Sequence, residues 1–254
     1  MSSARSIVVD PHVPCMLGLR ISMRVQEGNG DPLLLINGMT RPLESWDPFT
    51  RELQGRTVVS FDAPGVGGSP TTVRPLSIAE LATVAGAVLD AAGVAEADVL
   101  GYSHGGAVAQ ELVHRAPDRV RGLILASTSC GVGATPGTRR DVLRSLGGSL
   151  DGQPWPLPDP LGLLWQSLAF SNWSSIPFLG SIQAPTVVIC GSRDSVVPAS
   201  NSRVLAGRIP NASLVILPGR GHDLQRGESA KALARIVDDF SPTVLATERL
   251  RTCG

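Results

Sequence analysis

Residues 99–108 read Val99-Leu-Gly-Tyr-Ser103-His-Gly-Gly-Ala-Val108, a pattern that predicts a β-strand, a sharp turn and a helix in direct succession. The turn has the Gly-x-Ser-x-Gly spacing of a nucleophile elbow. A serine on so sharp a turn has a strained backbone, and glycines two residues before and after it let strand and helix approach closely because they lack a Cβ atom. The turn lifts the Ser103 hydroxyl clear of the sheet and places the first helical amides, from His104 onward, beneath an oxyanion formed there.

Apolar runs of strand length alternate with segments of helical spacing along the chain. Strands that are covered on both faces are predicted at 33–36, 57–61, 97–100, 122–126, 186–190 and 214–217. Helices are predicted at 42–53, 78–92, 104–114, 200–208 and 228–240, and an edge strand or hairpin at 16–25 before a turn at 27–32. This alternation predicts an α/β fold with a mostly parallel, doubly covered sheet, whose active residues lie at the carboxyl ends of the strands.

The regular pattern is interrupted over residues 131–181, which hold a proline-dense run and three tryptophans. So long an interruption between two core strands predicts a lid rather than a structureless loop. We therefore expect a core of residues 1–130 and 182–254 and a short lid of residues 131–181. The lid aromatics Trp155, Trp165, Phe170 and Trp173 suggest a binding surface for a hydrophobic acyl substrate. For each of them taken singly, the alternative is packing that fastens the lid to the core.

Composition excludes several classes of protein. The 254 residues are 43% hydrophobic and carry 22 basic and 22 acidic side chains, so one sizeable core is expected and a nucleic-acid or anionic-membrane surface is not. The N-terminal apolar run is too short for a signal peptide, and no stretch approaches a membrane span, so a cytoplasmic protein is expected. The four cysteines have no paired spacing, which indicates neither a disulfide nor a metal site, and Cys190 is predicted to be a buried reduced thiol.

A serine hydroxyl becomes a good nucleophile only when a base removes its proton and a third group holds that base in place. The chain has four histidines. His12 lies in the N-terminal segment, while His104 and His114 lie on the helix that follows Ser103 and cannot readily reach its hydroxyl. His222, in the loop after the last predicted strand, is therefore the candidate base.

Asp194 is the preferred acid, because it follows the strand at 186–190 directly and lies at a carboxyl end of the sheet. The loop after the strand at 122–126 offers no carboxylate before Asp141. Asp223 is discounted because adjacent residues rarely orient each other's side chains. Asp62 is interpreted as a structural residue that holds the following Pro-Gly-Val-Gly-Gly loop.

The order Ser103, Asp194, His222 and several stretches of sequence resemble the α/β-hydrolases over nearly the whole chain. These stretches are Leu33-Leu-Leu-Ile-Asn-Gly-Met-Thr40, Phe61-Asp-Ala-Pro-Gly-Val-Gly-Gly-Ser69 and the elbow itself. Within that superfamily the chain is most similar to intracellular polyhydroxyalkanoate depolymerases and related esterases, through Ile-Asn-Gly, Pro-Gly-Val-Gly-Gly-Ser and Arg208-Ile-Pro-Asn-Ala-Ser-Leu-Val-Ile-Leu217.

The resemblance implies an α/β-hydrolase fold and an oxyanion hole formed by the backbone N–H groups of Met39 and His104. Asn37-Gly38 stands where many members have His-Gly, a change that leaves this backbone donor in place. The lid at 131–181 does not match those depolymerases, so their activity is not carried over.

These observations predict a cofactor-free serine hydrolase that acts on a small hydrophobic carboxylic ester, or on a thioester. The same scaffold also supports acyltransferases, lyases, C–C bond hydrolases and cofactor-free oxygenases, and a ligand receptor without turnover is a further alternative. A serine at the elbow argues against dehalogenase and epoxide-hydrolase chemistry, which uses aspartate there. A complete set of three candidate side chains favours an enzyme over a receptor.

Overall fold

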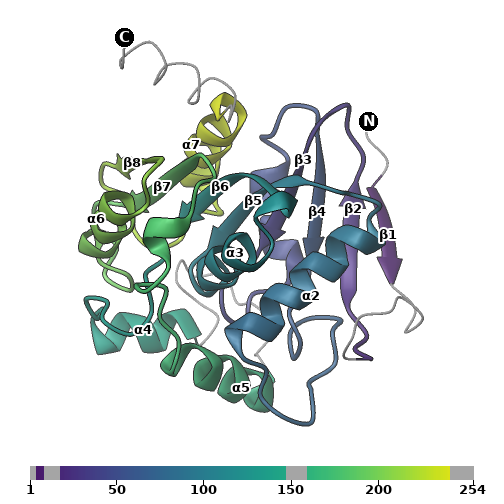
Figure 1. Cartoon of the computed structure of the whole chain (residues 1–254), viewed down its shortest axis with the longest axis horizontal. Helices are drawn as coiled ribbons and strands as arrows, with labels where there is room; N and C mark the ends of the chain where they lie inside the picture. The colour runs from purple at the N-terminus through teal and green to yellow at the C-terminus, as the bar shows by residue number, and fades with distance from the viewer. Residues whose placement is uncertain (1–3, 9–17, 147–158, 241–254) are drawn as a thin grey trace.

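An eight-stranded sheet forms the centre of the computed structural model, which describes residues 4–8, 18–146 and 159–240 (Figure 1). The strand order is β1-β2-β4-β3-β5-β6-β7-β8. The neighbours from β4 through β8 run parallel, while β1 pairs with β2 and β2 with β4 in antiparallel register. The predicted mostly parallel α/β sheet is confirmed.

The strands are β1 (Ala4–Val8), β2 (Ser22–Gln26), β3 (Gly30–Ile36), β4 (Arg56–Phe61), β5 (Ala97–Tyr102), β6 (Val120–Ala126), β7 (Thr186–Gly191) and β8 (Ala212–Leu217). The α-helices are α1 (Asp47–Thr50), α2 (Ile78–Ala91), α3 (His104–Arg115), α4 (Arg139–Leu146), α5 (Pro160–Ser171), α6 (Ala199–Arg208) and α7 (Gly227–Asp239). Short 3-10 turns lie at η1 (Leu43–Trp46), η2 (Pro117–Arg119) and η3 (Leu179–Ser181). None of the helices in these ranges is long and apolar enough to cross a membrane.

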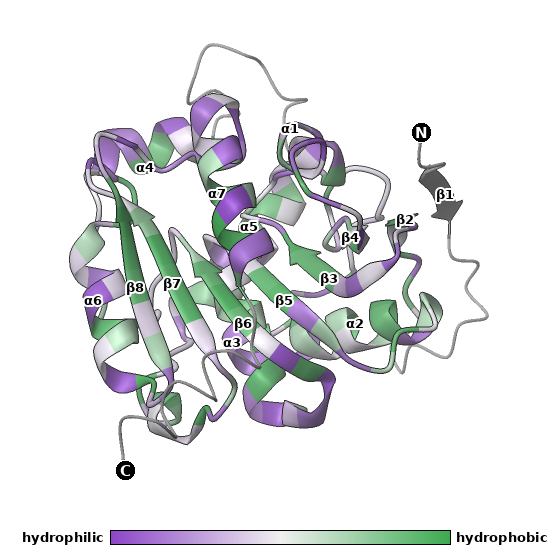
Figure 2. Ribbon diagram, turned by 90° about the horizontal axis from the view of Figure 1, so that it is seen from above, coloured by the Kyte–Doolittle hydropathy of each residue, from purple (hydrophilic) through white to green (hydrophobic). Residues whose placement is uncertain are grey.

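Side chains of the central strands alternate between two hydrophobic clusters. In β3, Leu33 and Leu35 pack in one cluster with α1 and α7, while Leu34 and Ile36 pack in the other with α2, α3 and α6. Figure 2 shows how strongly apolar the central strands are. Helices thus cover both faces of the sheet, which is why these strands read as unbroken apolar runs.

The structure differs from the sequence-based expectation in three places. The predicted helix at 42–53 is the 3-10 turn η1 followed by the short helix α1, because Pro48 has no N–H to donate to an i−4 carbonyl. The predicted turn at 27–32 contains the start of β3, whose pairing with β4 is irregular between Gly30 and Leu33. Strand β1 was not predicted, because its five residues, Ala4-Arg-Ser-Ile-Val8, form neither a long apolar run nor an alternating pattern.

Residues 131–181 contribute α4, α5 and η3 between β6 and β7, and α4 and α5 lie together beside one end of the sheet in Figure 1. Trp155 lies outside the described residues.

Asp62 has the structural role predicted for it. Its carboxylate accepts hydrogen bonds from the backbone N–H of Leu43 at 2.7 Å and of Gly68 at 2.8 Å. Burial raises the pKa of Asp62 above its ordinary value. The residue therefore holds the loop after β4 against the turn η1.

Gly101→Ala is expected to lower the free energy of unfolding by about 1–3 kcal/mol, because the added Cβ would lie 2.6 Å from the Ala109 Cβ and 2.6 Å from the Gly105 carbonyl oxygen. Gly207→Ala near the end of α6 is the control, since an added Cβ there meets nothing within 4 Å. That change should leave stability unchanged or raise it by up to about 1 kcal/mol. Urea unfolding followed by circular dichroism measures the stability of both variants and of the wild type. A Gly101→Ala variant as stable as the wild type would contradict the close strand–helix contact at the elbow.

Candidate active site

Ser103 occupies the junction between β5 and α3 with φ 52° and ψ −118°, so the predicted strained backbone is present. The backbone N–H of Ser103 donates to the Ala126 carbonyl at 2.9 Å, and its own carbonyl accepts from the Thr128 hydroxyl at 2.6 Å. A Cβ added at Gly105 would overlap the carbonyl oxygen of Ile36, so the first turn of α3 packs directly on the end of β3. Neighbouring strands thus hold a conformation that costs about 1–3 kcal/mol.

The structure brings the three predicted side chains into one hydrogen-bonded row. His222 Nε2 lies 3.1 Å from Ser103 Oγ, and His222 Nδ1 lies 2.9 Å from Asp194 Oδ2. The other carboxylate oxygen of Asp194 accepts from the backbone N–H groups of Val196 at 3.0 Å and Val197 at 2.8 Å. An ionised carboxylate only accepts, so the proton of the neutral imidazole lies on Nδ1 and the lone pair on Nε2 faces the serine hydroxyl.

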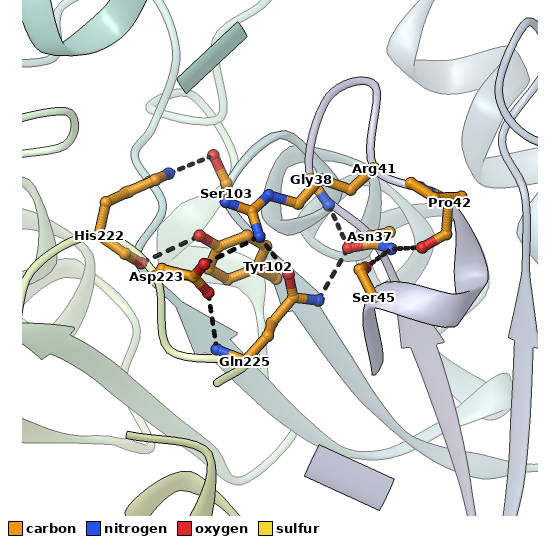
Figure 3. A network of polar contacts seen from close by, with 10 residues as sticks. All are labelled: Asn37, Gly38, Arg41, Pro42, Ser45, Tyr102, Ser103, His222, Asp223 and Gln225. Carbon is orange, nitrogen blue, oxygen red and sulfur yellow. Dashed lines mark hydrogen bonds and ion pairs between the residues drawn. The ribbon is translucent and has the colours of Figure 1, made fainter. Parts of the chain in front are cut away.

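Asp223 makes contacts elsewhere, as Figure 3 shows. One oxygen of its carboxylate lies 3.3 Å from Arg41 Nη1, and the other accepts from the Gln225 backbone N–H at 3.1 Å. The Arg41 guanidinium lies 5.4 Å from the centre of the Tyr102 ring, and the Tyr102 hydroxyl donates to the His222 carbonyl at 3.0 Å. This buried group of side chains therefore holds the loop that carries His222 in place.

Asn37 connects the same group to the turn that carries Met39. Its Oδ1 accepts from the Gly38 backbone N–H and from Gln225 Nε2, each at 2.9 Å. Its Nδ2 donates to the Pro42 carbonyl at 2.8 Å and to the Ser45 hydroxyl at 2.7 Å. The amide therefore holds the backbone turn after β3 from both sides.

Sequence reasoning missed Arg41 and Gln225. The available signal was their position, because each lies within four residues of a motif residue, Asn37 in one case and His222 in the other.

Ser103 and His222 open into a cavity of about 460 Å³. Met39 and His104, the predicted oxyanion residues, line it beside Ser103, and α4 and α5 line its far side. Among the described lining residues, Arg41 is the single Lys, Arg, Asp or Glu side chain, and Asp223 and Gln225 bind it. Among the described lining residues, the cavity therefore has no Lys, Arg, Asp or Glu side chain without a charged or polar partner.

The predicted lid aromatics divide into two groups. Phe170 lines the cavity, as expected. The prediction for Trp165 and Trp173 is corrected, because neither lines it. The Trp165 indole N–H donates to the Thr72 carbonyl at 2.9 Å, and that of Trp173 donates to Glu111 at 2.8 Å. These two side chains fasten α5 and the segment after it to the core.

Neither a metal site nor a disulfide is found in the part of the chain that the structure describes. No three His, Cys, Asp or Glu side chains cluster there as metal ligands would. Cys130 and Cys190 are buried, as predicted for Cys190, and neither forms a disulfide with another cysteine in the described ranges.

A family model for the alpha/beta hydrolase fold matches residues 31–151 and 149–227. The chain belongs to this alpha/beta hydrolase family. A poly(3-hydroxyalkanoate) depolymerase from Ectopseudomonas oleovorans is 35% identical over 251 residues, which cover 87% of this chain and 88% of that protein. The resemblance and the α/β-hydrolase fold expected from the sequence are confirmed.

A second sequence relative and a solved structure are also similar over most of the chain. A 2-hydroxymuconate semialdehyde hydrolase from Pseudomonas putida is 33% identical over 88% of this chain and 91% of that protein. The crystal structure of a hydrolase from Pseudomonas aeruginosa PA01 has a TM-score of 0.78 at 24% identity and covers 94% of this chain and 99% of that one, a likeness that shows the fold alone. Of the two sequence relatives, one is named a depolymerase and the other a hydrolase, and together with the family match they support the prediction of a hydrolase-type enzyme.

His104, beside the nucleophile, is a buried histidine. Burial lowers the pKa of His104 to about 4, and a hydrogen bond to the backbone of Gln166 partly opposes that shift. The imidazole is therefore neutral at pH 7, and no positive charge lies next to Ser103 from this side.

His104→Gln is expected to make stability less sensitive to acid. An unfolded histidine binds a proton near pH 6.5, whereas folded His104 binds one only near pH 4, so the unfolded state binds more protons between these values. The wild type should therefore lose up to about 3 kcal/mol more than the variant between pH 7 and pH 4. Urea unfolding at both pH values measures this difference, and parallel losses in the two proteins would contradict it.

Proposed function

We propose that this protein is a cofactor-free serine hydrolase that cleaves an uncharged, hydrophobic carboxylic ester with Ser103, His222 and Asp194. The observation that carries the proposal is the hydrogen-bonded row of these side chains, which opens at Ser103 into a cavity with no unpaired charged side chain among its described lining residues. Serine, imidazole and carboxylate in this order are the arrangement required for acyl transfer to a serine.

In the proposed mechanism, Ser103 Oγ attacks the ester carbonyl carbon while His222 Nε2 takes the hydroxyl proton. Asp194 stabilises the imidazolium that forms. The carbonyl oxygen becomes an oxyanion, which the backbone N–H groups of Met39 and His104 stabilise. The C–O bond to the alcohol then breaks, and the alcohol leaves with the proton from His222. Water, deprotonated by His222, attacks the acyl-enzyme, and the same steps release the acid and restore Ser103.

We further propose that residues 131–181 act as a lid over the core formed by residues 1–130 and 182–254. Residues of α4 and α5 line the same cavity as Ser103, so this segment bounds the space available to the acyl group. Phe170 is the lid aromatic proposed to contact substrate. A cytoplasmic location, expected from the N-terminal sequence, belongs to the same proposal.

The charges around the cavity favour an ester over an anionic substrate. The relative from Pseudomonas putida is named for a semialdehyde and the one from Ectopseudomonas oleovorans for a polyester, so identity alone leaves the bond that is cleaved undecided. A substrate carboxylate would need an unpaired cation, and Arg41 already binds Asp223 and Gln225. A neutral ester, including an ester of a hydroxy acid, fits this cavity better than an anionic substrate does.

The first test is hydrolysis of p-nitrophenyl esters from acetate to palmitate by the wild type and by Ser103→Ala. The wild type should show a maximum at one chain length, and the variant should lose at least about ten-thousandfold in kcat because the nucleophile is gone. A fluorophosphonate probe, located by mass spectrometry, should label Ser103. Labelling without turnover of any ester would move acyl transfer or elimination ahead of hydrolysis, and the absence of both would favour a receptor.

A second test compares Asp194→Asn with Asp223→Asn. Asp194→Asn should lower kcat about ten-thousandfold, because the amide can no longer favour the Nδ1 proton of His222. Asp223→Asn leaves the imidazole contacts intact but removes the charge that faces buried Arg41. It should chiefly lower the free energy of unfolding, by up to about 3–5 kcal/mol. Steady-state kinetics and urea unfolding of both variants separate the two roles; a larger kcat loss in Asp223→Asn would reverse the assignment.

A further inference from the structure

One side chain of α5 contacts the turn that carries Met39, one of the two proposed oxyanion donors. Gln166 is only 3% exposed, and its Oε1 accepts a hydrogen bond from the backbone N–H of Thr40 at 3.0 Å. Its backbone also forms a hydrogen bond with the imidazole of His104. Thr40 directly follows Met39, and His104 supplies the second proposed N–H donor. The Gln166 side chain therefore holds the Met39 half of the hole from the side of the proposed lid, while the contact to His104 is made by the Gln166 backbone.

Thr40 has a backbone conformation that needs such a partner. It is buried, its φ is 61°, and it lies in a turn that is closed by the Arg41 N–H donating to the Gly38 carbonyl at 3.2 Å. A β-branched residue in this left-handed region is strained by about 1–3 kcal/mol. Without an acceptor for its N–H, the Met39–Thr40 peptide could rotate to relieve that strain. The Met39 Cα joins this peptide to the Gly38–Met39 peptide, so such a rotation would loosen the turn and shift the Met39 N–H through that shared atom.

The next residue of α5 contacts Met39 as well. The Ser167 hydroxyl lies 3.6 Å from Met39 Sδ. Two consecutive residues of α5 thus pack against two consecutive residues of the oxyanion turn. The turn is held from below by Asn37 and from above by α5.

We propose that Gln166 is a positioning residue, whose side chain holds the turn after β3 so that the Met39 N–H keeps the orientation that an oxyanion requires. Oxyanion stabilisation is then coupled to the docking of α5, so the proposed lid takes part in forming the catalytic site as well as bounding the cavity. This inference rests on the proposed serine hydrolase function, and Gln166 acts through the turn without touching the reacting atoms.

The experiment compares Gln166→Met with Gln166→Glu. Methionine has a similar length but no oxygen to accept from Thr40, whereas glutamate keeps an acceptor oxygen in either protonation state. Loss of one oxyanion donor costs about a hundredfold to a thousandfold, so a misplaced donor should lower kcat about ten- to a hundredfold. For p-nitrophenyl hexanoate we expect that loss in Gln166→Met with an unchanged KM, and substantial recovery in Gln166→Glu. Leu164→Ala, on the exposed side of α5, should behave as wild type.

A trifluoromethyl hexyl ketone distinguishes positioning from general structural support. It adds to the serine hydroxyl and forms an oxyanion, so its inhibition constant should rise in Gln166→Met by the same factor as kcat/KM falls. Circular dichroism checks that each variant is folded, and Gln166→Leu replaces the methionine variant if that one is not.

Four results would overturn the inference alone: wild-type kcat in Gln166→Met, a change confined to KM, equal losses in Gln166→Met and Gln166→Glu, or no folded variant that lacks the acceptor. A wild-type protein that neither hydrolyses the ester nor reacts with the fluorophosphonate would instead overturn the proposed function, and this inference with it.

Discussion

The close contact of α3 with the ends of β3 and β5 is the constraint on which the site is built. Gly101 and Gly105 permit it, because a Cβ at either position would overlap neighbouring atoms. The contact forces Ser103 to a φ of 52°, and hydrogen bonds from the next strand and loop hold it there. The same contact brings the first turn of α3 beside the turn after β3. Nucleophile and proposed oxyanion hole therefore form from one packing arrangement.

A second layer of polar contacts lies beneath this arrangement. Asn37 and Gln225 join the turn after β3 to the His222 loop, and Arg41 with Asp223 joins both to Tyr102 (Figure 3). These groups are buried, so each lost contact leaves an unsatisfied partner. Rigidity of this kind suits a site in which donors must already be in place when charge develops.

The predicted arrangement of strands and helices was largely correct because doubly covered strands have an unmistakable pattern, an unbroken apolar run such as 33–36. The predictions were wrong where a single residue or a specific contact determines the local structure. Pro48 divides one predicted helix into two short pieces, and the short edge strand β1 is defined by its pairing with β2. Trp165 and Trp173 have the composition expected of a substrate surface, but their indole N–H groups find partners in the core.

The sequence by itself determined the family, the parallel sheet and the candidates Ser103, Asp194 and His222, because motif spacing and strand order place these residues at the same edge of the sheet. Only the tertiary structure decided which carboxylate faces His222, which aromatic side chain of residues 131–181 lines the cavity, and which partners Arg41, Gln225 and Gln166 contact. Those contacts join residues far apart in the chain, such as Thr40 and Gln166. Their geometry is set by packing, which local sequence patterns do not encode.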